Sequence, residues 1–203
     1  MNIENIHVKA DGSVHCRSRF YSAFDHLDGD ANYIFTTGVN KLVGEIDGGN
    51  WAVSYYLSMH NYRPKDFVLF TKTEVSVNGK MIPLQSIEKY ICYMDEEVFP
   101  LFSSKKSIKK LITQGIKKNK SKCTSEEIRK LFYLDDKRFQ RPIQCVGNER
   151  FRAMAAVGYA HGKQIFCFPW LSQNRFAYYH ENITYLLEIL ERLKVIAIVP
   201  MGK

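Results

Sequence analysis

The sequence lacks the features that mark membrane, secreted and fibrous proteins. It contains no run of about 18 apolar residues, and its N-terminus, MNIENIHVKADG, has neither the basic stretch nor the apolar core of a secretory signal. No collagen-like repeat, heptad pattern or low-complexity tract is present. With 203 residues, of which 45% are hydrophobic and 13% aromatic, the chain can bury a sizeable core. We expect one globular domain, or one domain with an inserted subdomain, located in the cytoplasm.

Cysteine and histidine are sparse and lack the spacing of metal or catalytic motifs. The five cysteines form no CxxC pair, and the six histidines form no HExxH motif. No nucleophile elbow or Cys-His signature stands out either. We therefore predict reduced, mostly buried thiols and no metal site, and a hydrolase of another class has little support.

Positive charge is concentrated in one segment. Residues 105–122, KKSIKKLITQGIKKNKSK, hold eight lysines and no acid, so of 29 Lys and Arg 21 remain against 21 Asp and Glu. Ile108, Leu111, Ile112 and Ile116 recur at helical spacing, which predicts an amphipathic helix whose apolar stripe faces a core or a partner. The lysines are either a solvated face or a surface for an acidic partner, an anionic membrane or a nucleic acid.

The first half of the chain reads as strands followed by a glycine loop and a helix. Residues 3–9 and 14–24 have strand patterns, and residues 32–46 read as an extended segment that leads through DGGN into an apolar helix at 51–60. A strand pair follows at 67–84, with a turn at Asn78 and Gly79.

The second half alternates helices and buried strands. A capping box at Thr124 and Glu127 predicts the start of a helix, and helices are expected at 149–162 and 182–193. Residues 164–170 and 195–199 read as buried strands, and strand, helix, strand at this spacing predicts a parallel α/β sheet.

In this order, the segments resemble the nucleotide-binding domain of ABC transporters over nearly the whole chain. VNKLVGEIDGGNW is similar to the strand and the Walker A loop, with Gly44 and Gly49 at the two glycine positions. YICYMDEE is similar to the entry of the Q-loop, with Glu96 at the glutamine position. CVGNERFRAMAA resembles the signature sequence and its helix, QIFCFPW stands at Walker B, and IAIVPM leads to the position of the switch histidine.

This resemblance implies a set of site residues. The degenerate P-loop comprises Gly44, Asp47, Gly48, Gly49, Asn50 and Trp51. The signature-like residues are Val146, Gly147, Asn148 and Glu149, the Walker B positions are Pro169 and Trp170, and the switch position is Met201.

The departures from the family pattern fall on the residues that do chemistry. Asn50 replaces the phosphate-binding lysine, and Trp51 replaces the hydroxyl residue that binds magnesium. Pro169 and Trp170 replace the Walker B aspartate and glutamate, and Met201 replaces the switch histidine. Because phosphoryl transfer depends on positioning and charge neutralisation, we expect no catalytic residue, no cofactor and no ordinary turnover. ATP with magnesium remains the alternative ligand.

The resemblance implies an α/β, P-loop NTPase-like fold with an N-terminal antiparallel part and an inserted helical subdomain. Residues 1–96 and 145–203 would form the RecA-like core, and residues 97–144 the helical subdomain. The first hypothesis is a pseudo-ATPase that acts as a regulatory or structural subunit, through homo- or heterodimerisation with an ABC-type domain or docking to a membrane permease. A peripheral position at the inner face of the membrane then becomes an option. The alternatives are an unusual ATPase that uses Asp95, Glu96 or Glu97, and a basic module that binds nucleic acid or another polyanion.

Overall fold

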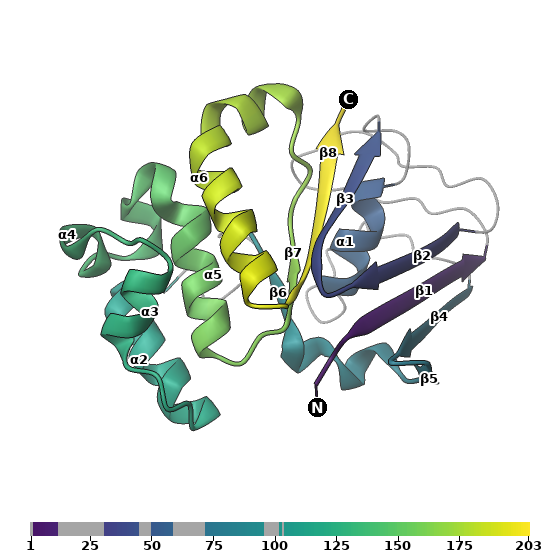
Figure 1. Ribbon diagram of the computed structural model, residues 1–203, viewed down its shortest axis with the longest axis horizontal. Coiled ribbons are helices and arrows are strands. Elements are labelled where there is room, and N and C mark those ends of the chain that lie inside the picture. The colour runs from purple at the N-terminus through teal and green to yellow at the C-terminus, as the bar shows by residue number, and fades with distance from the viewer. Residues whose placement is uncertain (1, 12–30, 45–49, 59–71, 96–101, 103) are drawn as a thin grey trace.

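The computed structural model describes residues 2–11, 31–44, 50–58, 72–95, 102 and 104–203 (Figure 1). An antiparallel sheet with the order β2-β1-β4-β5 lies at one end of the molecule. Its strands are β1 (Asn5–Asp11), β2 (Ala31–Thr36), β4 (Lys72–Val77) and β5 (Lys80–Met81). The turn between β4 and β5 has positive φ at both Asn78 (50°) and Gly79 (74°), as the Asn-Gly pair predicts. This hairpin extends from Lys72 at the start of β4 to Met81, and residues 67–71 of the predicted strand pair lie outside the described residues.

A second sheet is parallel and has the order β3-β8-β7-β6. Its strands are β3 (Gly38–Gly44), β6 (Ile91–Tyr93), β7 (Ile165–Cys167) and β8 (Ile196–Gly202). All three residues of β6 and of β7 are buried, as expected for strands covered on both faces. The prediction of a parallel α/β sheet is confirmed.

Gly38 divides the segment that the sequence presents as one extended stretch at 32–46. Its φ of 104° is a conformation that side-chain-bearing residues rarely adopt, and it separates β2 in the antiparallel sheet from β3 in the parallel sheet. A Cβ atom at this position would lie 2.7 Å from a carboxylate oxygen of Glu191. The glycine therefore permits both the bend and the close approach of the helix that carries Glu191.

Helices cover the two faces of the parallel sheet. The helices are α1 (Asn50–Ser58), α2 (Ile108–Asn119), α3 (Ser125–Leu131), α4 (Asp136–Phe139), α5 (Arg150–Ala160) and α6 (Gln173–Arg192). In Figure 1, α1 lies between the parallel and antiparallel sheets, whereas α5 and α6 lie on the opposite side and α2, α3 and α4 lie beyond α5. Short 3₁₀ turns at Leu84–Ser86, Glu88–Tyr90, Ile143–Cys145 and Gly147–Glu149 connect these elements.

The sequence predicted the start of α3 correctly but placed the start of α6 too late in the chain. The capping box is present as predicted, since Thr124 accepts a hydrogen bond from the amide of Glu127 and the Glu127 carboxylate accepts one from the amide of Thr124. Helix α6, in contrast, begins at Gln173 rather than 182. Its first turns are mainly exposed and therefore lack the apolar periodicity by which a helix is recognised, and the Ser172 side chain caps them by accepting from the amide of Arg175.

The apolar stripe of the lysine-rich helix α2 faces the core of this chain. Ile108, Leu111 and Ile112 are at most 1% exposed and belong to the hydrophobic cluster that also contains α5 and α6. Helices α2 and α5 approach each other closely at Gly115, where an added Cβ atom would lie 2.8 Å from the carbonyl carbon of Ala160. Of the two readings of the stripe, core and partner, the structure therefore selects the core.

Candidate functional site

Of the predicted site residues that the structure describes, those of the loop, Walker B and switch positions lie at the carboxyl edge of the parallel sheet. Strand β3 ends at Gly44, which pairs with Gly202 of β8, and α1 begins at Asn50. Leu171, immediately after Trp170, forms a bridge with Met201. The strand order brings residues from distant parts of the sequence together at this edge, which is also where open α/β sheets bind their ligands.

Several predicted positions cannot be placed in this geometry. Asp47, Gly48, Gly49 and Glu96 lie outside the described residues. Asn50 and Trp51 have helical backbone as the first two residues of α1, but their side chains are outside the described part. The described part of the loop is therefore Gly44 and the start of α1.

Pro169 and Trp170, at the Walker B positions, are both buried. Trp170 is 5% exposed and belongs to the hydrophobic cluster between the parallel sheet and α1, which also contains Val53 and Ile198. Beside it, the Ser54 hydroxyl donates a 2.6 Å hydrogen bond to the carbonyl of Phe168, which ties α1 to the end of β7. An indole and a pyrrolidine ring thus occupy the two positions where the family places carboxylates, and neither ring offers an oxygen to a metal ion or a water molecule.

Met201, at the switch position, is half-buried in β8 and packs against the cluster on the α5 and α6 side of the sheet. A thioether has no hydrogen to donate and is a weak acceptor, so Met201 cannot take the role of a histidine toward a phosphate.

The signature-like residues form a 3₁₀ turn that leads into α5. Val146 is buried, whereas Gly147 has a φ of 56° and Asn148 is exposed. Arg138 of α4 fixes this turn, because its Nη1 donates 3.0 Å hydrogen bonds to both Asn148 Oδ1 and Glu149 Oε1. A Cβ atom at Gly147 would meet nothing within 4 Å, so the turn presents an open backbone at the surface.

Internal contacts occupy the buried acid and the two arginines of this region. Glu149 is 8% exposed and also accepts from the amide of Asp135 at 3.3 Å. Arg152 Nη1 donates to the carbonyl of Tyr133 at 2.9 Å, and Nη2 lies 3.6 Å from Glu149. Burial lowers the pKa of Arg152 from its ordinary value, and the neighbouring Glu149 carboxylate opposes that change. Arg150 lies over the rings of Phe151 and Tyr179, with its guanidinium carbon 5.7 and 5.2 Å from their centres.

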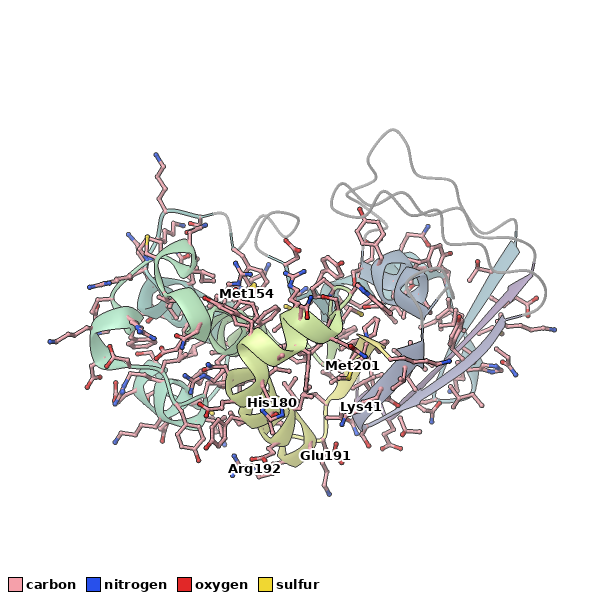
Figure 2. The ribbon with its side chains drawn as sticks, turned by 90° about the horizontal axis from the view of Figure 1, so that it is seen from above. Lys41, Met154, His180, Glu191, Arg192 and Met201 are labelled. Atoms are coloured by element: carbon pink, nitrogen blue, oxygen red, sulfur yellow. The ribbon has the colours of Figure 1, made fainter. Side chains whose placement is uncertain are left out.

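A cavity at the other end of α6 contains no site residue that the sequence predicted. Its volume is about 730 Å³, and its lining residues are Tyr133, Arg152, Tyr185, Glu188, Glu191 and Arg192. Figure 2 shows Glu191 and Arg192 together at the C-terminal end of α6, away from Met201. Sequence reasoning missed this cavity because its walls come from three separate segments, and no motif joins them.

Within the described residues, no group of three or more His, Cys, Asp or Glu side chains is placed to hold a metal ion. Of the helices described, none has the length and apolar character needed to cross a membrane.

No protein-family model and no curated protein matches this sequence. Its structure, however, is similar to solved structures of ABC transporter proteins. A putative ABC transporter ATP-binding protein from Pyrococcus furiosus has a TM-score of 0.61 at 17% identity, over 98% of this chain and 90% of that chain. The protein cbiO1 from Clostridium perfringens, part of the ABC transporter complex cbiONQ, has a TM-score of 0.58 at 14% identity, over 97% of this chain and 78% of that one.

A bacterial Atm1-family ABC exporter with ATP bound also matches, with a TM-score of 0.58 at 12% identity. The match covers 100% of this chain but only 35% of the exporter chain, so the chain spans about a third of that protein's length. At these identities the likeness concerns the fold. The chain has the fold of an ABC transporter ATP-binding domain.

Proposed function

We propose that this protein is a degenerate ABC-type cassette, a pseudo-ATPase that acts as a regulatory or structural subunit. The observation that carries the proposal is the burial of Pro169 and Trp170 at the Walker B positions. Exchange of a glutamate for an exposed residue could be compensated by a nearby acid. A tryptophan packed into the core instead fills the volume that a metal-bound water and its base would need.

Hydrolysis needs a general base, whose loss alone costs roughly 10²- to 10⁴-fold in rate, and charges that neutralise the phosphates. Asn50 and Trp51 remove the lysine and the magnesium ligand from the loop, in addition to the changes at Walker B. Because several independent contributions are missing, one substitution should not restore activity.

The signature-like turn suggests how such a subunit works with a partner. In the family's head-to-tail dimer, the signature of one protomer covers the nucleotide held by the other. Gly147 and Asn148 are exposed, and Arg138 and Glu149 hold the turn in place without covering it. We infer that this turn contacts a second cassette, either a copy of this chain or a competent ATPase. Docking of a membrane permease would involve the helical subdomain, which we assign to residues 97–144, with residues 1–96 and 145–203 as the RecA-like core.

The alternative of an unusual ATPase requires substitute acids. Asp95 is half-buried just beyond β6, and Glu96 and Glu97 lie outside the described residues. The three acids come from one short segment, whereas the family places one metal ligand in the Walker A loop, at Trp51 here, and the aspartate and glutamate at Walker B, at Pro169 and Trp170. This alternative is therefore the weaker one.

Titration of the protein with ATP and magnesium, followed by thermal melting and a phosphate-release assay, tests the proposal. A ligand at 100 times its dissociation constant would stabilise the fold by about 2.7 kcal/mol, and we expect no such shift and no hydrolysis above a protein-free control. Asn50→Lys should remain inactive. Turnover that Asn50→Ala abolishes would overturn the proposal, and sedimentation velocity with and without nucleotide would measure self-association.

A further inference from the structure

The lysine-rich surface, defined as the eight lysines of residues 105–122, is open to solvent along its whole length. Every one of these lysines is exposed, and none forms an ion pair with a described acid. Among the described residues, Lys106 Nζ donates a side-chain hydrogen bond to Gln114 Oε1 at 3.3 Å. The lysines are Lys105, Lys106, Lys109, Lys110, Lys117, Lys118, Lys120 and Lys122.

The two acids in the first turn of α3, Glu126 and Glu127, have their main partners within α3 and its cap. Glu126 of α3 lies 2.6 Å from Arg129, and that hydrogen bond is the main reason why the pKa of Glu126 is lowered. Glu127 closes the capping box with Thr124, whose amide lies 2.7 Å away. Since α2 itself has no acid, the compensation that its positive charge receives from α3 is the weaker attraction between Lys109 and Glu126, which also contributes to the lowered pKa of Glu126.

The positions of two lysines at the start of α2 are unfavourable for the stability of the helix. Lys109 and Lys110 lie in the first turn of α2, where the helix dipole disfavours positive charge, and no acid in that turn offsets them. Only Lys117 and Lys118, in the last turn, are placed favourably. Acidic residues near Ser107, the N-cap, would stabilise the helix instead.

The packing of α2 excludes an apolar partner for this face. Ile108, Leu111 and Ile112 are buried against α5, so the surface that remains is charged and not amphipathic. Figure 1 shows α2 on the side of α5 that faces away from the two sheets. At Gly115, α2 packs directly against Ala160 and His161. The helix that carries the lysines is therefore held closely against the rest of the protein.

We propose that the lysine-rich surface binds an anionic membrane surface through the phosphate and carboxylate groups of its lipids. Lysine is a point charge on a long stem and suits a diffuse layer of headgroups. Nucleic-acid surfaces typically add arginine forks and aromatic rings on which bases stack, and residues 105–122 contain neither. The inference does not depend on the proposed pseudo-ATPase function, since it uses no residue of the carboxyl edge.

Vesicle co-sedimentation of the full chain tests the inference. The probes are vesicles of phosphatidylcholine alone and vesicles that also contain about 30% phosphatidylserine, at low and high salt. We expect binding only to the anionic vesicles and loss of binding at high salt, because the attraction is screened within about 10 Å at 0.1 M salt. Each lysine near such a surface strengthens binding roughly fivefold, so replacing four should weaken it by roughly several hundredfold.

The decisive variant carries Lys109→Gln, Lys110→Gln, Lys117→Gln and Lys118→Gln. Its matched control removes the same charge from exposed lysines elsewhere, with Lys9→Gln, Lys41→Gln, Lys80→Gln and Lys203→Gln. Melting curves should show that both variants are folded, and only the variant with the four substitutions in α2 should no longer bind anionic vesicles. Absence of binding to anionic vesicles, equal weakening by both variants, or a duplex DNA or RNA that displaces the vesicles at lower phosphate concentration would each overturn the inference.

Discussion

Restoring the family's glutamate at the second Walker B position should unfold the protein rather than activate it. Trp170 is 5% exposed and packs in an apolar cluster with Val53 and Ile198. Removal of a large buried aromatic side chain costs about 3 to 5 kcal/mol, and an unpaired carboxyl group placed there adds at least about 1 to 3 kcal/mol. The sum is a large part of the roughly 5 to 15 kcal/mol that stabilises a typical domain. We therefore expect Trp170→Glu to be largely unfolded or to have a much lower urea midpoint.

The pH dependence of this variant separates packing from charge, with Trp170→Gln as the matched neutral control. Burial raises the pKa of an introduced carboxyl group in the folded state, whereas in the unfolded chain it titrates near 4.3. Above that pH the unfolded chain releases a proton that the folded chain retains. The Glu variant should therefore lose stability relative to the Gln variant as the pH rises, by up to about 1.4 kcal/mol per pH unit until the pH reaches the raised pKa.

Urea denaturation between pH 5 and pH 8, followed by tryptophan-independent far-ultraviolet circular dichroism, measures this difference on the scale of about 1.4 kcal/mol per unit. Trp170→Phe, which keeps an apolar ring, should lose less stability than either polar variant. A Trp170→Glu protein that is as stable as the wild type, or that hydrolyses ATP, would refute the argument that the indole fills the site.

Three further outcomes follow from the packing and the local contacts. Leu111→Ala, at a residue 1% exposed, should cost about 2 to 5 kcal/mol by urea denaturation, whereas the four-Gln variant of α2 should lie within about 0.5 kcal/mol for each exposed site. Thr124→Ala removes the cap of α3 and should cost about 1 kcal/mol in the same assay; an unchanged midpoint would show that the capping box contributes nothing. Burial raises the pKa values of Cys92 and Cys167 to about 12, so a thiol reagent at pH 8 should modify exposed Cys145 rapidly and these two only on unfolding.

Local interactions made part of the structure predictable from the sequence alone. The capping box at Thr124 and the Asn78–Gly79 turn are formed by neighbours in the chain, and their geometry therefore follows from residue types a few positions apart. The buried strands at 164–170 and 195–199 could likewise be recognised by their apolar runs, although β7 is shorter than its pattern and β8 longer. The ordered series of such elements was sufficient to predict the parallel sheet and the ABC-type fold.

The candidate site was predictable only in part. The pattern of motifs assigned Pro169, Trp170 and Met201 to one site, and the strand order brings them to one edge. That Trp170 points into the core was not predictable, because the alternation of a three-residue strand does not specify which face its following residues take. The start of α6 was misplaced for a different reason, because the exposed residues of its first turns show no apolar periodicity.

Tertiary structure alone decided what each surface faces. From the sequence, the apolar stripe of α2 could face either the core of this chain or a partner. The close packing of Gly115 against Ala160 places the stripe in the core and leaves the lysines exposed. The division of residues 32–46 between two sheets depends on Gly38 and its approach to Glu191, more than 150 residues away. Sequence patterns record the preferences of neighbours, whereas burial and pairing depend on contacts between residues distant in the chain, and these exist only once the chain has folded.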